Sequence, residues 1–265
     1  MELDEKQIER YSRNIVLAEL GVEGQRRLRA ASVLVVGAGG LGSPVSLYLA
    51  AAGVGRLGLI DPDDVELSNL QRQVLHSSLS LGMSKVESAA AGVLELNPDV
   101  EVETEQGRLN ADNALELVGR YDFVVDCTDN FSAKYLINDA CVIVGKPFSH
   151  AGVLGFGGQA FTWEPPVGNS PCLRCMLPEQ PPADETPNCA GSGVLGAAVG
   201  VLGSVQAAEA IKSVTGIGER LTGRILSFDC LKMRFSSARF VLDPSCPVCS
   251  GNANISTLSA HNYRH

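Results

Sequence analysis

The stretch SVLVVGAGGLGSPVSLYLA, residues 32–50, constrains the fold more than any other part of the chain. A β-branched apolar run leads into a glycine turn, and the turn leads into an apolar segment with helical spacing. In the pattern Gly37-x-Gly39-x-x-Gly42, Gly37 permits a tight turn, and Gly39 and Gly40 allow a phosphate to approach closely. Because the following helix offers free amides and a positive dipole end, the stretch predicts a phosphate site at the end of a buried strand.

Strand and helix patterns alternate through the first half of the chain. This alternation with short connections predicts a Rossmann-like, mostly parallel sheet with helices on both faces. The expected strands are 32–36, 56–60, 100–104, 123–126 and 147–150, and the expected helices are 5–16, 22–31, 41–52, 84–96, 111–120 and 131–144. Beyond Gly152 the segments 155–163, 223–230 and 232–242 predict a more antiparallel part, with a long apolar helix at 194–213 between them.

The composition narrows the class of protein. A net charge of −9 without a basic run argues against general binding to nucleic acid or to an anionic membrane. Gln206 and Glu209 interrupt the most apolar helix, which we therefore expect to be buried rather than membrane-spanning. The charged N-terminus is not a signal peptide, so the eight cysteines are expected to be thiols or metal ligands of a cytoplasmic protein.

The glycine pattern alone does not choose among nucleotides, and packing of the turn is its alternative explanation. Asp61 follows Gly42 by nineteen residues, where an acid can bind a ribose hydroxyl. Asn69, Arg72 and Gln73 follow the second strand. These side chains are candidates for contacts with the rest of the nucleotide.

Two charged residues favour ATP. Lys85 opens a helix, where the dipole disfavours a cation, so it either has an anionic partner or is solvated. Asp129 follows the fourth strand and could hold magnesium on a triphosphate or cap the next helix. With Arg72, these residues form a clamp for phosphate charge, which a dinucleotide oxidoreductase does not need.

The cysteines fall into two groups. Cys172 and Cys175 form one C-x-x-C pair, and Cys246 and Cys249 form a second pair roughly seventy residues later. Four thiolates favour a closed tetrahedral zinc site, with redox dithiols or an iron–sulfur cluster as alternatives. Cys127, Cys141 and Cys230 lie in apolar or strand contexts, whereas Cys189 precedes a helix start, which favours a thiolate.

Taken together, the ordered motifs resemble those of the bacterial MoeB/ThiF adenylyltransferases, relatives of the ubiquitin-activating enzymes. The resemblance extends from about residue 8 to residue 250. Its motifs are RYSRNIVL, VLVVGAGGLGSPVSLYLAAAGVGRLGLIDPDDVELSNLQRQ, GMSKVESA, DCTDN, PCLRC, GVLGAAVGVLGSVQAAEAIK and CPVC. It implies transfer of AMP from MgATP to the C-terminal Gly-Gly carboxylate of a small ubiquitin-like sulfur-carrier protein, with release of pyrophosphate.

The resemblance also implies roles for individual residues. Gly40 would approach the phosphates, Asp61 would bind ribose, Asp129 would coordinate magnesium, and Arg13 would reach the ATP site of the other subunit of a homodimer. The remaining nucleotide-binding positions would be Ser68, Asn69, Leu70, Gln71, Arg72, Gln73, Lys85 and Asn130.

One further cysteine and the supply of sulfur are also part of this expectation. Cys189 matches a family cysteine implicated in sulfur transfer in the thiamine branch, although Asn188 stands where threonine is common. A separate protein is expected to donate sulfur, because no sulfurtransferase domain follows.

The expected organisation is one adenylyltransferase domain over residues 1–250 with a polar, disordered tail at 251–265. Residues 32–150 would bind the nucleotide, and residues 151–250 would bind the carrier and zinc. Activation of the molybdopterin-pathway carrier is the leading hypothesis. The alternatives are a thiamine-pathway carrier, a carrier for amino-acid or siderophore synthesis, an NAD- or FAD-binding oxidoreductase, and a nucleotide-binding scaffold without catalysis.

Overall fold

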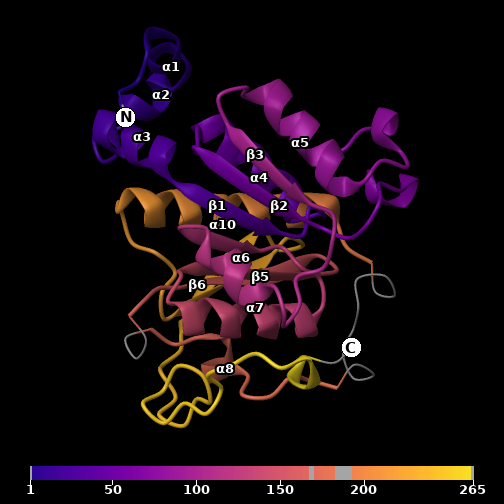
Figure 1. Ribbon diagram of the computed structural model, residues 1–265, viewed down its shortest axis with the longest axis vertical. Helices are drawn as coiled ribbons and strands as arrows, with labels where there is room; N and C mark the ends of the chain where they lie inside the picture. Colours follow the sequence, from indigo (N-terminus) through magenta and orange to yellow (C-terminus); the bar gives the residue numbers. More distant parts are fainter. Residues whose placement is uncertain (1, 167–169, 183–192, 264–265) are drawn as a thin grey trace.

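The chain folds around one eight-stranded sheet, as the computed structural model in Figure 1 shows for residues 2–166, 170–182 and 193–263. The strand order is β3-β2-β1-β4-β5-β6-β7-β8. The strands are β1 (Ser32–Val36), β2 (Arg56–Ile60), β3 (Glu101–Glu105), β4 (Phe123–Asp126), β5 (Phe148–Leu154), β6 (Gly157–Trp163), β7 (Arg224–Asp229) and β8 (Arg234–Arg239). Neighbouring strands in the part β3-β2-β1-β4-β5 are parallel, and those in the part β5-β6-β7-β8 are antiparallel, as the sequence predicts.

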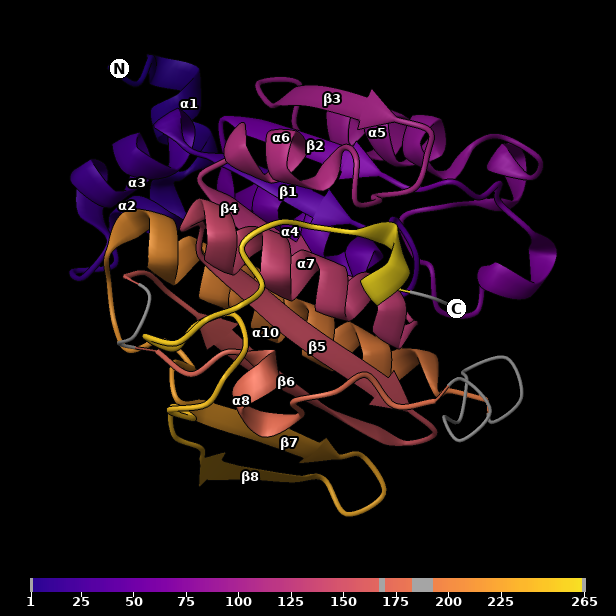
Figure 2. The ribbon, with the colours of Figure 1, turned by 60° about the horizontal axis from the view of Figure 1, so that its bottom comes forward.

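Helices cover both faces of the sheet, which confirms the predicted fold class. They are α1 (Glu5–Arg10), α2 (Ser12–Ile15), α3 (Gly21–Ala30), α4 (Gly42–Ala52), α5 (Lys85–Leu96), α6 (Ala114–Gly119), α7 (Phe131–Val144), α8 (Leu173–Met176) and α10 (Gly196–Thr215). Figure 2 shows α6 and α7 in front of the sheet, with α4 and α10 behind it. Both faces carry a hydrophobic core, so β1 is buried along its whole length.

The long helix α10 is buried by packing on α4, β5 and β6. The two polar residues that interrupt its apolar sequence, Gln206 and Glu209, hold the helix in this position by hydrogen bonds. Gln206 donates to the Asp126 and Ser149 carbonyls, and Glu209 accepts from the Thr162 hydroxyl and the Leu221 amide. None of the helices within the described residues is long and apolar enough to span a membrane.

Most element boundaries agree with the sequence analysis to within a few residues, and β5 is longer than expected. Its extension to Leu154 comes from the antiparallel hairpin with β6, whose turn contains Gly155 at φ +58°. Helix α4 ends at Gly53 in the left-handed conformation, where any Cβ would collide with the Tyr11 ring at 2.4 Å.

The structure describes most of the polar tail that the sequence analysis expects to be disordered. Its described part, up to Tyr263, includes the short helix η3 (Ala260–Asn262). Ile255 and Leu258 pack against the core on the α7 face, and the Tyr263 hydroxyl donates to Asp139. A few apolar side chains and one buried acceptor thus order a segment whose average composition is polar.

Candidate nucleotide and metal sites

The glycine turn between β1 and α4 is built by close backbone contacts. Gly37 has φ +98°, and a Cβ there would lie 2.9 Å from the Cys127 carbonyl oxygen. A Cβ on Gly42 would lie 2.0 Å from the Gly37 carbonyl oxygen. The turn is further fixed by Asp61, whose carboxylate accepts from the Ala38 amide at 2.8 Å. Packing inside the protein therefore requires glycine at both ends of the pattern.

The two middle glycines differ from each other. A Cβ on Gly39 would meet only the Gln73 side chain, at an ordinary 3.5 Å, so nothing in the described chain forbids a larger residue there. A Cβ on Gly40 would lie 2.9 Å from Val199 on α10. Packing thus accounts for Gly40, whereas approach of a ligand is an available reason for Gly39.

A pocket of about 990 Å³ opens at the carboxyl ends of the parallel strands. Open α/β sheets bind ligands at this edge. The predicted site residues that line it are Gly37, Gly39, Gly40, Asp61, Arg72, Gln73, Lys85, Asp129 and Asn130. The other predicted nucleotide-binding residues do not line it: Gly42, Ser68, Asn69, Leu70 and Gln71.

Lys85 is not solvated, because it lies 6% exposed at the start of α5. Its ammonium group lies 2.8 Å from Asp63 and 3.9 Å from Asp61. Asp61 and Asp63 are therefore the anionic partners expected for a lysine at the start of a helix. Asp63 was not among the residues predicted from the sequence. Burial raises the pKa of Asp61, although Lys85 and the amides of Asp63 and Ala38 oppose this shift.

The segment after β2 folds back to place Arg72 at the pocket. Helix η1 (Leu67–Asn69) has Glu66 as its N-cap residue, and the Glu66 amide donates to the Asn69 side chain. The Ser68 hydroxyl donates to Glu66, and the Ser68 carbonyl accepts from the Arg72 guanidinium at 3.1 Å. Arg72 has no carboxylate partner among the described ion pairs. Its charge is consequently available to a ligand.

Asp129 and Asn130 divide the two roles that the sequence left open at the start of α7. Asn130 is the helix cap, since its side chain accepts from the Ala133 amide at 2.9 Å. The alternative that Asp129 caps this helix is therefore wrong. Asp129 is exposed at the pocket, and no hydrogen bond or ion pair within the described residues occupies its carboxylate.

A buried charged cluster at the end of β4 has no signal in the local sequence. Asp126 is fully buried and lies 3.1 Å from the Lys134 ammonium and 2.8 Å from His150 Nδ1. Its other oxygen accepts from the Thr128 amide and hydroxyl. Burial opposes ionisation, but Lys134, His150 and Thr128 together hold the pKa of Asp126 well below its usual value. Asp126 thereby shapes the loop that presents Asp129.

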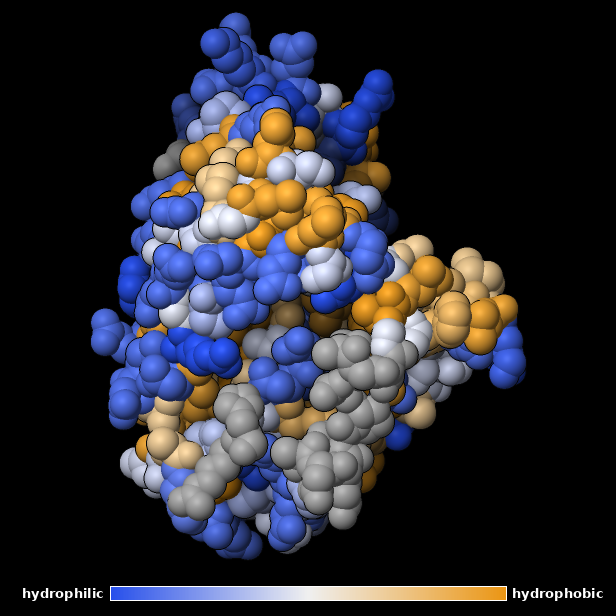
Figure 3. Space-filling model, turned by 90° about the vertical axis from the view of Figure 1, so that its right-hand side faces the viewer, coloured by the Kyte–Doolittle hydropathy of each residue, from blue (hydrophilic) through white to orange (hydrophobic). Residues whose placement is uncertain are grey.

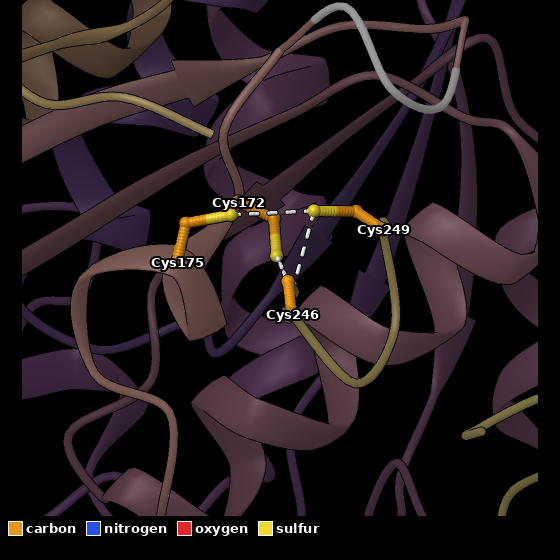
Figure 4. Close-up of side chains that lie close together, drawn as sticks. All are labelled: Cys172, Cys175, Cys246 and Cys249. Carbon is orange, nitrogen blue, oxygen red and sulfur yellow. Dashed lines mark hydrogen bonds between the residues drawn. The ribbon is translucent and has the colours of Figure 1, made fainter. Parts of the chain in front are cut away.

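The four paired cysteines converge as predicted (Figure 4). Their sulfur atoms all lie within 4.8 Å of one another, and Cys172–Cys246 and Cys175–Cys249 are 3.7 and 3.3 Å apart. Zinc–sulfur bonds of about 2.3 Å give a tetrahedron with edges of about 3.8 Å. The all-thiol donor set and its spacing fit a tetrahedral metal. Cys127 and Cys141 are buried in the core, as expected.

The cysteine cluster is tied to α7 by a buried ion pair. Arg174, between the first two cysteines, contacts both oxygens of Asp139 at 2.8 and 2.7 Å. The Asn138 side-chain oxygen Oδ1 accepts from the Leu173 amide. Since α7 begins at the pocket and carries these residues farther along, one helix connects the two sites.

Two predicted residues lie apart from the pocket or outside the description. Arg13 is exposed on α2 and does not line the pocket of its own chain. Cys189 lies outside the described residues.

Apolar side chains form part of the molecular face that Figure 3 shows. The segment between β2 and α5 contributes the exposed apolar residues Leu67, Val74, Leu79, Leu81 and Met83.

The chain matches a model of a known protein family and is similar in sequence to known proteins. A family model described as the ThiF family matches residues 11–248. The adenylyltransferase and sulfurtransferase MOCS3 of Bos taurus is 49% identical over 257 residues, which are 97% of this chain and 56% of that protein. The chain therefore spans little more than half the length of the MOCS3 relatives.

Two further proteins match this chain over a larger share of their own length. The SAMP-activating enzyme E1 of Haloferax volcanii is 46% identical over 263 residues, 99% of this chain and 96% of that protein. The crystal structure of Escherichia coli MccB with ATP superposes with a TM-score of 0.81 at 26% identity, over 93% of this chain and 75% of that chain.

The buried cluster predicts a pH-dependent effect of Lys134→Met. The substitution leaves the Asp126 carboxylate buried without its cation, so the free energy of unfolding at pH 7 should fall by about 3 kcal/mol. In the native chain the depressed pKa of Asp126 gives stability that persists above the unfolded pKa of about 3.9. In the variant that pKa rises, so protonation relieves the penalty and the deficit should shrink towards pH 5.

Urea unfolding at pH 7 and pH 5 checks this, with exposed Lys6→Met as the matched control. A deficit that is independent of pH would contradict the role assigned to Lys134.

Proposed function

Since the chain belongs to the ThiF family, we propose that it is an ATP-dependent adenylyltransferase. Its acceptor is the C-terminal Gly-Gly carboxylate of a small ubiquitin-like sulfur-carrier protein, and its second product is pyrophosphate. The names of two relatives support this assignment, because one is an adenylyltransferase and the other is an activating enzyme E1. We place the reaction in the cytoplasm, in the activation of the molybdopterin-pathway carrier, with the thiamine-pathway carrier as the alternative.

The observation that carries the proposal is the convergence of phosphate and metal groups in one pocket. The glycine turn, Arg72, Lys85 and Asp129 come from four separate segments and line the same cavity. A redox dinucleotide needs the turn and Asp61, whereas it does not need this set of charges. A triphosphate needs all of them.

The charge balance explains what the reaction requires. The carrier carboxylate is already ionised at neutral pH, so the nucleophile needs no general base. The difficulty is repulsion between that carboxylate and the triphosphate. Lys85 is already paired with Asp61 and Asp63, and Lys134 with Asp126, so these cations are largely compensated. Arg72 and Arg108 line the pocket without a carboxylate partner among the described ion pairs, but two cations do not balance a triphosphate and a carboxylate. Further positive charge is therefore required before the carboxylate can reach the α-phosphorus.

We assign that added charge to a magnesium ion and to Arg13 of a second subunit. Asp129 would hold the ion, since its carboxylate faces the pocket without a partner among the described residues. Magnesium neutralises phosphate oxygens when it is bound. The pair Asp63–Lys85 keeps the ammonium group in place until phosphate oxygens can share it, because Asp63 is half-exposed and can yield its contact.

The antiparallel half of the pocket offers a path for the carrier tail. Gly152, Gly157 and Gly158 line it along β5 and β6. A Cβ on Gly152 would meet no atom of the described residues within 4 Å, whereas Gly157 and Gly158 pack directly against backbone. An extended Gly-Gly segment has no side chains and fits a shallow path of this kind. A sulfur nucleophile from a separate donor protein would then displace AMP from the mixed anhydride formed there, and Cys189 is a candidate participant in that step.

ATP–pyrophosphate exchange with each purified carrier tests the proposal. We expect exchange with the molybdopterin-pathway carrier, and a decrease on the order of 100-fold for Lys85→Ala because it removes a preorganised cation from the phosphates. Lys6→Ala, on the exposed surface of α1, is the matched control and should keep full exchange. Exchange with neither carrier would count against adenylation, and exchange with only the thiamine-pathway carrier would change the pathway.

We propose that the cysteine cluster holds one structural zinc ion. Four thiolates leave no open coordination position, so the metal would stabilise the fold rather than take part in catalysis. Metal analysis should find one zinc per chain, and Cys246→Ser should lower both zinc content and melting temperature. Cys230→Ser, outside the cluster, should keep both. A native chain without zinc, or zinc retained after all four cysteines become serine, would refute the site.

The homodimer is supported by Arg13, which is exposed and absent from its own pocket, and by the apolar residues between β2 and α5. Mixing inactive Arg13→Ala subunits with inactive Lys85→Ala subunits should restore exchange, because some mixed dimers would contain one complete site. Unmixed samples of each variant are the controls. No recovery in dimers shown to be mixed would exclude donation of Arg13 between subunits.

A further inference from the structure

The C-terminal strap, residues 250–263, runs from the cysteine cluster to the pocket. It begins directly after the last cysteine of the cluster, crosses α7, and ends with η3 and Tyr263. In both ribbon views η3 lies beside the first turns of α7, the end of that helix that faces the pocket (Figures 1 and 2).

The start of the strap is fixed to the second cysteine pair. The Ser250 hydroxyl donates to the Cys246 carbonyl at 2.6 Å. The amides of Asn254 and Ile255 both donate to the Pro247 carbonyl at 2.9 Å. The cluster therefore sets the direction in which the strap leaves it.

The far end of the strap is fixed inside the protein. Ile255 and Leu258 pack against the core, and the Tyr263 hydroxyl donates to Asp139 at 2.8 Å. Asp139 is fully buried, and Arg174 and Asn138 also donate to it. Burial raises the pKa of the Tyr263 hydroxyl farther above neutral pH, and the hydroxyl donates to Asp139.

The end of the strap shares the pocket with the phosphate turn. Ala260 and Tyr263 line the same cavity as Gly39, Lys85 and Asp129. The glycine turn leads into α4 behind the sheet, whereas the strap packs on α7 in front of it. The strap therefore lines the α7 side of the same cavity, across the sheet from α4.

We propose that the C-terminal strap forms a wall of the nucleotide pocket and that Tyr263 holds this wall in place, increasing the affinity for the nucleoside triphosphate. This inference rests on the proposed function for the identity of the nucleotide. Without the strap, water reaches the α7 side of the bound nucleotide, and the apolar contact of the Tyr263 ring is lost.

Nucleotide binding by truncated and substituted chains tests the strap. The probe is the magnesium complex of α,β-methylene ATP, which cannot release pyrophosphate. A chain that ends at Ser250 keeps all four cluster cysteines, and we expect its dissociation constant to rise about tenfold, equivalent to about 1.4 kcal/mol. Tyr263→Ala should show most of this loss, and Tyr263→Phe, which keeps the ring, should show less. Thr257→Ala, exposed on the same segment, should bind as the native chain does.

Zinc content and melting temperature are measured on every variant. If truncation changes the zinc content or the melting temperature, the dissociation constant of Tyr263→Ala decides the test. Equal dissociation constants for this variant and the native chain would overturn the strap while leaving adenylation intact, even if binding of the carrier became weaker. A native chain that binds no triphosphate would overturn both proposals.

Discussion

Where β1 turns into α4, backbone atoms pack so closely against each other that no side chain fits between them. The site depends on this contact. Gly37 packs against the Cys127 carbonyl at the end of β4, and Gly42 packs against Gly37 itself. These contacts bring the ends of β1 and β4 together and aim the start of α4 at the space between them. Asp61, at the end of β2, locks the turn by accepting from the Ala38 amide. Three neighbouring strands thereby open into one pocket.

Buried charges then decide how the pocket walls are held. Each is compensated: Lys85 by Asp61 and Asp63, Lys134 by Asp126, and Arg174 by Asp139. Such pairs contribute little net stability compared with apolar packing, but breaking one leaves an uncompensated charge. They fix the position of the α5 start, the β4–α7 loop and the cysteine cluster. Arg72 and Asp129 have no carboxylate or cation partner among the described residues, and both line the pocket, where a ligand can satisfy them.

The alternation of patterns was sufficient to predict the parallel half because its strands β1, β2 and β4 are almost entirely buried and its connections are short. The four cysteines could also be grouped in advance, since paired C-x-x-C spacing is chemically specific and the thiols do converge. Other features lacked a local signal. Lys134 and His150 meet Asp126 only after α7 and β5 pack against β4. The tail reads as polar, and three separated side chains, Ile255, Leu258 and Tyr263, order it through contacts with distant residues.

The sequence by itself determined the strand–turn–helix unit, the sheet class, the cysteine pairs and the family, because each is encoded in local spacing and residue type. Only the tertiary structure decided which polar residues are compensated and which remain available. Asn130 rather than Asp129 caps α7, and Lys85 is buried between two acids rather than solvated. These outcomes depend on distances between elements far apart in the chain, and burial sets the strength of their electrostatics. The same long-range packing carries Tyr263 to the wall of the pocket.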